Sequence, residues 1–326
     1  MNRKRKNIIA NNEISELYTF SLGGYPQKVL IEGKQKDLPV VIFLHGGPGS
    51  PFPFSVGCRG LFPEFTDRFI MVYWDQLGCG ANNHVIDEQF TINSFVIMTE
   101  ELIHEVKSLF PENKIFIFAT SWGSILSAKV LERTKKLVGG VVACGQIVKE
   151  IFFNQEVIGE LEKAKLPVEK LNRIKQADVE KITSKEMQLV SASIRNYTSG
   201  YQNKAGETAS MGGIIRGLLT SPDYSFKDFK ALMINGYQNN ISLWKEILKV
   251  NLSDTLRKVQ IPYMMIQGET DIVASTKEVQ QVVATAGNAC LQCRVIEKAG
   301  HYPNKAVMDA IFEELVVMAC ERKNEV

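Results

Sequence analysis

Hydrophobic runs and amphipathic stretches alternate along the first half of the chain. Four near-continuous apolar runs have the length expected of strands covered on both faces, at 39–44, 69–74, 114–119 and 138–144. Residues 91–110 instead repeat large hydrophobic side chains every three or four positions and end at Pro111, which predicts a long helix. A shorter helical pattern covers 124–133. This alternation predicts an α/β fold with a mostly parallel sheet and helices on both faces.

Further strand signals lie near both ends of the chain. Residues 18–20 and 25–32 are joined by a Leu-Gly-Gly turn and are predicted to form a pair of edge strands. After a long interval the alternation resumes with a strand, a helix, a strand and a final helix, at 262–267, 275–286, 293–296 and up to Cys320.

The interval between these two parts has a helical pattern without a buried-strand signal. It runs from 147 to 250 and is interrupted by Pro167, Pro222 and glycines. The sequence therefore predicts a helical cap at 147–250, inserted after the sixth strand of a core made of 1–146 and 251–326. Most of the aromatic residues in the cap are expected to pack inside it, and such an insert can also roof a pocket.

Composition narrows the class of partner. The 326 residues carry 38 Lys and Arg against 36 Asp and Glu, a net charge of +2, so no overall field favours nucleic acid or an acidic membrane surface. The basic run at 3–6 is expected to be a solvated tail, because the residues after it are too few and too polar for a signal peptide. No apolar segment reaches the length of a membrane-spanning helix.

Cysteine usage indicates a reducing compartment. The six cysteines are scattered and do not form the spacing of a disulfide framework, so a cytoplasmic protein is expected. Cys290 and Cys293 form an isolated CxxC beside a predicted strand. Without a second pair or a nearby histidine, we interpret this motif as structural.

Ser121 lies where a predicted strand passes into a predicted helix. Small residues stand two positions before it (Ala119) and two after it (Gly123), which is the pattern of a tight turn that holds a serine hydroxyl above a sheet edge. A serine that only caps the following helix gives the same local pattern. The function of Ser121 must therefore be judged from the rest of the chain.

Two further polar residues follow predicted strands at the same edge. Asp271 comes shortly after the strand at 262–267, and His301 follows the strand at 293–296. The carboxyl ends of parallel strands meet at one edge, so Ser121, Asp271 and His301 are expected to lie close together. An imidazole can take the proton of a serine hydroxyl, and a buried carboxylate can hold the imidazole in the required tautomer.

The other three histidines are expected to be structural or solvated. His84 lies in a polar loop and His104 on the long predicted helix, while His45 opens the glycine-rich loop HGGPG at 45–49. That loop follows a predicted strand and exposes backbone N–H groups that could bind a phosphate or an oxyanion. It lacks the P-loop pattern, which argues against a nucleotide site.

These motifs together resemble those of the α/β-hydrolase superfamily and, within it, of the proline iminopeptidase group. The group carries an HGGPG loop, a WDQxGxG segment and a GxSWG elbow, which read here HGGPG at 45–49, WDQLGCG at 74–80 and ATSWG at 119–123. The resemblance covers about two thirds of the chain and implies an α/β-hydrolase core. It also implies Ser121 as nucleophile, His301 as base and Asp271 as the acid that orients it.

The resemblance further implies an oxyanion hole made by the backbone N–H groups of Gly47 and Trp122, with Gly46 shaping the loop. Three positions depart from the group. Ala119 replaces a glycine, Leu77 stands where the group usually has Arg, and Ile234 stands where aminopeptidase members have an acidic residue that holds the substrate amine. Glu207 and Glu246 could supply that acid from other positions, although a solvated surface role is the commoner one for a glutamate.

The predicted function is that of a serine hydrolase that works through an acyl-enzyme, with no cofactor and no metal. The preferred activity is an aminopeptidase that removes an N-terminal residue such as proline from small peptides or amides. An esterase is the alternative, and a non-catalytic binding protein on the same scaffold is a more remote one. Enzymes with an Asp nucleophile are disfavoured because the elbow carries Ser121. The expected partner is a small molecule or short peptide, and the oligomeric state is left open.

Overall fold

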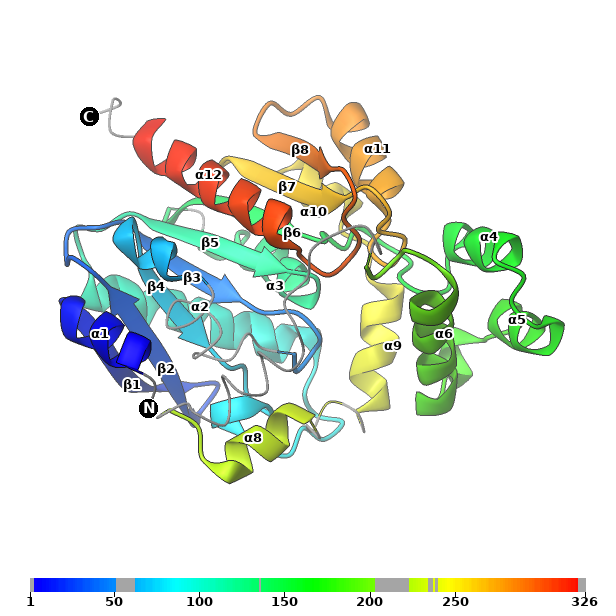
Figure 1. The fold of residues 1–326 in the computed structure, drawn as a ribbon, viewed down its shortest axis with the longest axis horizontal. Helices are drawn as coiled ribbons and strands as arrows, with labels where there is room; N and C mark the ends of the chain where they lie inside the picture. The colour runs from blue at the N-terminus through cyan, green and yellow to red at the C-terminus, as the bar shows by residue number, and fades with distance from the viewer. Residues whose placement is uncertain are drawn as a thin grey trace.

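The computed structural model describes residues 3–50, 62–134, 136–202, 223–233, 237 and 240–321. Within them, eight strands form one sheet in the order β1-β2-β4-β3-β5-β6-β7-β8 (Figure 1). The antiparallel pairs are β1 with β2 and β2 with β4, and all other neighbours are parallel. The strands are β1 Ile14–Leu22, β2 Tyr25–Gly33, β3 Val40–Leu44, β4 Ile70–Trp74, β5 Ile115–Thr120, β6 Val138–Cys144, β7 Tyr263–Gly268 and β8 Leu291–Ile296.

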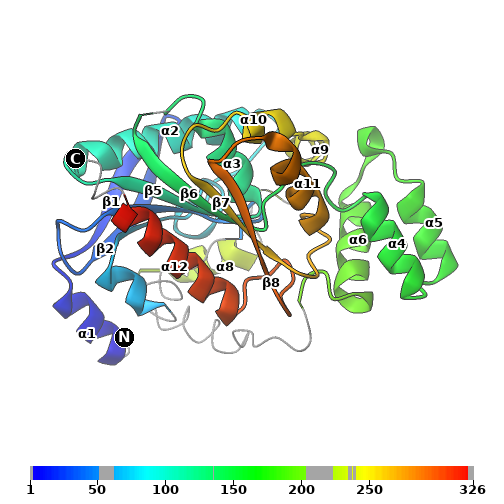
Figure 2. The same ribbon diagram turned by 90° about the horizontal axis from the view of Figure 1, so that it is seen from above.

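Helices cover both faces of the sheet, which explains why its central strands are hydrophobic throughout. In β3, Val40 and Ile42 belong to the buried cluster that includes α2 (Ile92–Leu109) and α3 (Trp122–Val130), whereas Val41 and Phe43 pack in the cluster of α12 (Lys305–Glu321). Successive side chains of a strand point to opposite faces, so each central strand serves two cores. Figure 2 shows α2 and α3 on one side of the sheet and α12 on the other.

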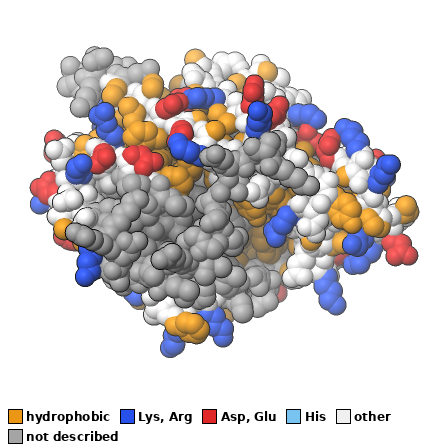
Figure 3. All heavy atoms as spheres, viewed as in Figure 1, with side chains coloured by type: hydrophobic (Ala, Val, Ile, Leu, Met, Phe, Trp, Pro, Cys, Tyr) orange, Lys and Arg blue, Asp and Glu red, His pale blue; other side chains and the backbone are white. Residues whose placement is uncertain are grey.

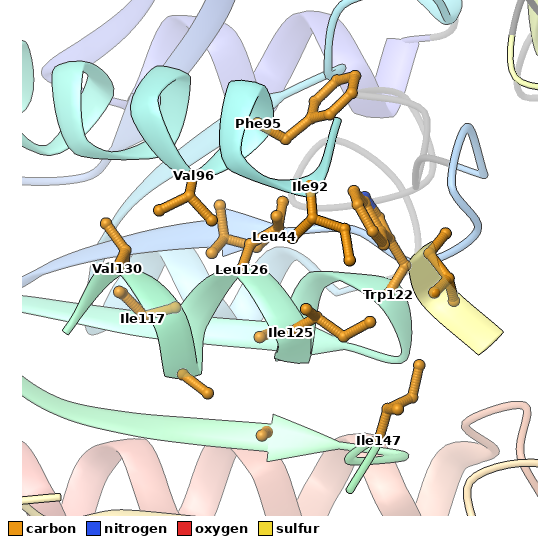
Figure 4. Close-up of a cluster of buried hydrophobic side chains, with 14 of the residues drawn as sticks. Leu44, Ile92, Phe95, Val96, Ile117, Trp122, Ile125, Leu126, Val130 and Ile147 are labelled. Atoms are coloured by element: carbon orange, nitrogen blue, oxygen red, sulfur yellow. The ribbon is translucent and has the colours of Figure 1, made fainter. Parts of the chain in front are cut away.

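Packing between α2 and α3 holds α3 against the sheet. Val96 of α2 and Leu126 and Val130 of α3 lie between the two helices in Figure 4, and all three side chains are buried. The rings of Phe95 and Trp122 meet edge to face, with centroids 5.8 Å apart. The first turn of α3, which begins immediately after Ser121, is therefore fixed by buried apolar contacts.

Most observed elements match the predicted ones, although the strand predicted at 18–20 is β1 over Ile14–Leu22 and the helix predicted at 124–133 is α3 over Trp122–Val130. The predicted helix at 91–110 is α2, with Thr91 as its N-cap and Phe110 as its C-cap, and the predicted strand at 138–144 is β6. The basic N-terminal run, expected to be a solvated tail, belongs to a helix whose Lys6 and Asn7 are exposed. Residues Arg3–Asn11 form helix α1, which agrees with the high helix propensity of Arg, Lys and Ala. No helix of the described residues is long and apolar enough to span a membrane.

A helical insert leaves the sheet after β6 and returns before β7. Its two ends lie side by side, because Lys149 and Asn251 form an isolated antiparallel bridge and Leu252 N–H donates to Val148 O over 2.8 Å. The helices in between are α4 Gln155–Lys163, α5 Val168–Lys175, α6 Ser184–Tyr197, α8 Phe226–Met233 and α9 Ile241–Lys249, followed by α10 Ser253–Arg257. In Figure 1 the helices α4, α5, α6 and α9 stand beyond the carboxyl ends of the central strands. We propose the division drawn from the sequence, with 147–250 as cap.

A buried glutamine joins the three loops that carry the sequence motifs. The side chain of Gln76, after β4, donates to His45 O over 3.2 Å and accepts the indole N–H of Trp122 over 2.7 Å. Gln76 is fully buried, and its own backbone N–H donates to His45 Nε2 over 3.0 Å. The glycine loop after β3, the loop after β4 and the turn after β5 therefore form one hydrogen-bonded unit at the carboxyl edge of the sheet.

The bonds of His45 fix its tautomer. The Gly46 carbonyl, 2.8 Å from Nδ1, can only accept, and the N–H of Gln76 can only donate to Nε2. The ring is therefore neutral with its proton on Nδ1. Burial lowers the pKa of His45 to about 4, although the hydrogen bond to Gly46 opposes this change.

We predict that Gln76→Leu lowers the free energy of unfolding by about 2 to 5 kcal/mol, because the Trp122 indole and the His45 carbonyl lose their buried partner. Urea denaturation would measure the loss. Gln89→Leu, an equivalent change at an exposed position, should leave the stability nearly unchanged. Equal stability of the two variants would contradict the bridging role of Gln76.

The lowered pKa of His45 predicts a loss of stability at acidic pH. Because the unfolded chain binds the His45 proton near pH 6.5 and the folded protein does not until about pH 4, this stability is complete above pH 6.5 and declines as the pH falls. Between pH 7 and pH 5 we expect His45 to account for about 2 kcal/mol of the decline. His45→Asn, which cannot titrate, should lose that much less over the same interval; parallel curves would exclude the proposed linkage.

Candidate active site

Ser121 occupies a sharp turn between β5 and α3. Its backbone has φ 48° and ψ −116°, a conformation that costs free energy in a residue with a side chain. The turn is held by the Ser121 N–H, which donates to Cys144 O over 2.9 Å. A Cβ atom at Gly123 would lie 2.1 Å from Leu44 O, so no larger residue fits there. A small residue is therefore needed two positions after the serine because the backbone there lies against that of Leu44.

The structure brings Ser121, His301 and Asp271 into one hydrogen-bonded chain. The Oγ atom of Ser121 lies 2.8 Å from His301 Nε2, and His301 Nδ1 lies 2.8 Å from Asp271 Oδ2. Asp271 follows β7 and His301 follows β8, as the sequence indicated. Asp271 and His301 are 2% and 8% exposed, whereas Ser121 is only partly buried. The serine is therefore the member of the chain that meets solvent.

The Asp271 carboxylate is fixed through its other oxygen. Oδ1 accepts the backbone N–H groups of Val273 over 2.9 Å and of Ala274 over 3.0 Å. These bonds leave Oδ2 directed at the His301 ring. Because a carboxylate only accepts, the proton of the imidazole lies on Nδ1, and Nε2 is free to accept the proton of the Ser121 hydroxyl.

The glycine loop lies directly against the serine. A Cβ atom at Gly46 would be 3.3 Å from Ser121 Cβ and 3.3 Å from Thr120 O, so the loop backbone touches the turn. Trp122 is the first residue of α3, and its backbone N–H has no acceptor within the helix. The positive end of the α3 dipole adds to the attraction for an anion at this place.

Gly145 is a site residue that the sequence reasoning missed. It follows β6, and a Cβ atom there would lie 3.1 Å from His301 Cε1 and 3.2 Å from His301 Nδ1. A side chain at this position would press on the imidazole. The available signal was a glycine immediately after a predicted strand, at the same edge as Ser121.

Tyrosines of the cap hold the loop after β4. The Tyr224 hydroxyl donates to Asp75 Oδ2 over 2.8 Å, and the Tyr237 hydroxyl donates to Leu77 O. Leu77 thus contacts the cap through its carbonyl, although it lacks the charge of the arginine found in the similar group. Burial raises the pKa of Asp75 to about 7, against the hydrogen bonds from Ala81 and Tyr224, which lower it.

The two glutamates suggested as amine ligands have different outcomes. Glu246 lies on α9, and its carboxylate accepts the N–H of Ile92 at the start of α2 over 2.8 Å. This contact joins the cap to the core and favours a structural role for Glu246. Glu207 and Ile234 lie outside the described residues. On the face seen in Figure 3, hydrophobic side chains gather beside the cap helices.

The other histidines and cysteines that the sequence singled out lie outside the site around Ser121. His84 and His104 are exposed, and Cys290 and Cys293 are free, half-buried thiols. Across the part of the chain that the structure describes, no group of three His, Cys, Asp or Glu side chains is arranged to hold a metal ion.

Comparison with known proteins identifies the family. Residues 39–305 match the model of the α/β hydrolase fold family. The chain is 24% identical over 276 residues to the probable aminopeptidase YbaC of Bacillus subtilis, covering 82% of this chain and 84% of that one. It is also 24% identical over 252 residues to the proline iminopeptidase of Thermoplasma volcanium, covering 74% and 75%.

A solved structure gives the same fold. The proline iminopeptidase of Mycobacterium smegmatis superposes with a TM-score of 0.63 at 18% identity, covering 94% of this chain and all of the other. The family match spans most of the chain, including all of the motifs that surround Ser121. The chain therefore belongs to the α/β hydrolase fold family, as a hydrolase whose relatives include named aminopeptidases.

Proposed function

We propose that the protein is a serine hydrolase that cleaves small peptides or amides through an acyl-enzyme, with Ser121, His301 and Asp271 as its catalytic triad. The observation that carries this proposal is the continuous hydrogen-bonded chain from Ser121 Oγ through the imidazole to the buried Asp271. All three members stand at the carboxyl edge of the sheet, and the serine occupies the strained turn typical of a nucleophile elbow.

In the first half of the reaction Ser121 Oγ attacks the substrate carbonyl carbon, and its proton passes to His301 Nε2. Asp271 stabilises the resulting imidazolium and keeps the ring in place. When the tetrahedral intermediate collapses, the bond to the leaving group breaks and His301 returns the proton to it. An ester now joins the acyl group to Ser121.

The oxyanion of the intermediate is assigned to the backbone N–H groups of Trp122 and Gly47. Support comes from the contact between Gly46 and Ser121 and from the first turn of α3, whose amides lack helical acceptors. In the second half, water gives a proton to His301 and attacks the acyl carbon; the ester bond to Ser121 then breaks, and His301 returns the proton to Ser121 Oγ as the acid leaves.

We prefer aminopeptidase activity among the possible hydrolase activities. The support is that two relatives matching about three quarters or more of the chain carry aminopeptidase or proline iminopeptidase names. A partner of this kind is a short peptide with a free N-terminal amine. The scattered free cysteines support a cytoplasmic location as part of the same proposal.

An esterase remains the second candidate because of a specific sequence feature. Ile234 stands where the similar aminopeptidases have an acidic residue for the substrate amine, and an isoleucine cannot bind an ammonium group. The triad and oxyanion groups proposed here would cleave an ester by the same steps, without any anchor for the amine.

A set of three substrates tests the proposed activity. We expect hydrolysis of a proline arylamide with a free amine, little hydrolysis of its N-acetylated form, and none of either by Ser121→Ala, because that variant lacks the nucleophile. A short-chain aryl ester completes the set. Release of the arylamine or phenol would be followed by absorbance, and circular dichroism would check that the variant is folded.

Equal rates for the free and acetylated amides, together with rapid ester cleavage, would replace the aminopeptidase by an esterase. Full activity of Ser121→Ala on any of the three substrates would exclude Ser121 as the nucleophile.

Asp271→Asn should lower kcat by about 10⁴-fold while preserving the fold. The new amide nitrogen would face His301 Nδ1 and favour the tautomer that cannot take the proton of Ser121, while the amide oxygen can still accept from Val273 and Ala274. Steady-state kinetics and thermal denaturation would be compared with Asp254→Asn, a change at an exposed aspartate. A loss of less than tenfold would remove Asp271 from its proposed role.

A further inference from the structure

A short segment that follows cap helix α6 lies against both loops that carry His301 and Asp271. The His301 N–H donates to Gly200 O over 2.8 Å, and the next N–H, of Tyr302, donates to Tyr201 O over 2.8 Å. The hydroxyl of Thr270, the residue before Asp271, donates to Ser199 O over 2.8 Å. The cap segment 199–201 therefore binds the base loop and the acid loop at the same time.

The three backbones touch without side chains between them. A Cβ atom at Gly300 would lie 2.8 Å from the carbonyl carbon of Tyr201 and 2.9 Å from Gly200 O. At Gly268 it would lie 2.3 Å from Gly300 O. Real Cβ atoms essentially never come this close to another atom, so only glycine fits at these two positions and the backbones are in direct contact. Because close-packed backbones have no room to move independently, a shift of the cap segment would displace the loop of His301.

Tyr201 adds a side-chain contact to the imidazole itself. Its ring meets that of His301 nearly edge to face, with centroids 5.9 Å apart, and stacks on Tyr302 at 5.0 Å. Tyr201 is 6% exposed.

Helix α6 in turn fixes the ring of Tyr201. Ser191 Oγ lies 2.9 Å from the Tyr201 hydroxyl, and the guanidinium of Arg195 lies 5.5 Å from the ring centroid. Both partners are on the cap helix, so the orientation of α6 and that of the ring beside His301 are linked.

We infer that the cap segment 199–201 is a positioning element for the catalytic base, through which helix α6 holds His301 at the distance from Ser121 that proton transfer requires. This inference rests on the proposed function and extends it, because the cap then forms part of the catalytic geometry as well as covering the substrate. Tyr201 is the positioning residue, and it acts through His301 without contact with the reacting atoms.

The test measures proton transfer apart from substrate recognition. An alkyl fluorophosphonate reacts with the serine of a competent triad: an O–P bond forms, fluoride leaves, and the serine proton passes to the histidine. We expect Tyr201→Leu to slow this inactivation by on the order of 10- to 100-fold. For whichever of the three substrates the wild type hydrolyses, kcat should fall by a similar factor with KM nearly unchanged. Tyr201→Phe keeps the ring and should retain most of the rate.

Two further variants complete the experiment. Tyr197→Leu changes a more exposed tyrosine, the last residue of α6, and should react like the wild type. Thr270→Val conserves shape and the backbone bond to Ala299 O but removes the hydroxyl bonds to Ser199 O and Ala299 O, and it should also slow inactivation. It decides the question if Tyr201→Leu does not fold.

The outcomes separate this inference from the proposed function. If the folded wild type does not react with the fluorophosphonate, the proposed function fails. If the wild type reacts and both Tyr201→Leu and Thr270→Val react at its rate, the positioning role is overturned. A raised KM with an unchanged inactivation rate would also overturn it, since that pattern indicates a contact with substrate.

Discussion

The structure of the site depends on one tight turn between a buried strand and a buried helix. Ser121 tolerates φ 48° there because both sides of the turn are anchored, β5 within the sheet and α3 against α2. The absence of a side chain at Gly123 allows α3 to start within contact of Leu44 O. Burial of apolar surface thus supplies the free energy that keeps a strained residue in place, and the strain leaves the hydroxyl exposed beside His301.

The loops around this turn are stabilised mainly by buried polar bonds. The Gln76 side chain joins the glycine loop to the turn at Ser121 by binding His45 O and the Trp122 indole. The neutral ring of His45 adds a second bond by accepting the backbone N–H of Gln76. The cap is attached to these loops through tyrosine hydroxyls at Asp75 and Leu77 and to the base loop through its backbone. Buried polar groups of this kind demand complete pairing, so the arrangement of the loops is specified more narrowly than apolar contacts alone would specify it.

The sequence predicted the sheet and the close placement of Ser121, Asp271 and His301 because both follow from local rules. Hydrophobic runs located the strands, and parallel strands place the residues that follow them at one edge, which brought Ser121, Asp271 and His301 together. Contacts of the cap could not be predicted in this way. The segment 199–201 has no periodicity, and its partners Thr270 and His301 lie 71 and about 100 residues away in the chain. Gly145 was missed because its contact with the His301 ring joins loops that follow two different strands, β6 and β8, and the sequence does not give the distance between those loops.

The bridge between Lys149 and Asn251 closes the insert at its base, so the core presents the same two adjacent chain ends whatever lies between them. Such an arrangement suits exchange of one cap for another during divergence, or by grafting in the laboratory. The freedom is unequal along the insert, however. Helix α5 packs mainly on α4 and α6 and is the part of the insert that can vary most. Helix α4 is more constrained, because Asn154 and Glu156 bind Ile272 and Ser275 after β7, and any replacement must also reproduce a backbone that pairs with His301 and Tyr302. New specificities are therefore expected to arise by substitution around a retained contact at Gly200, more readily than by replacement of the whole insert.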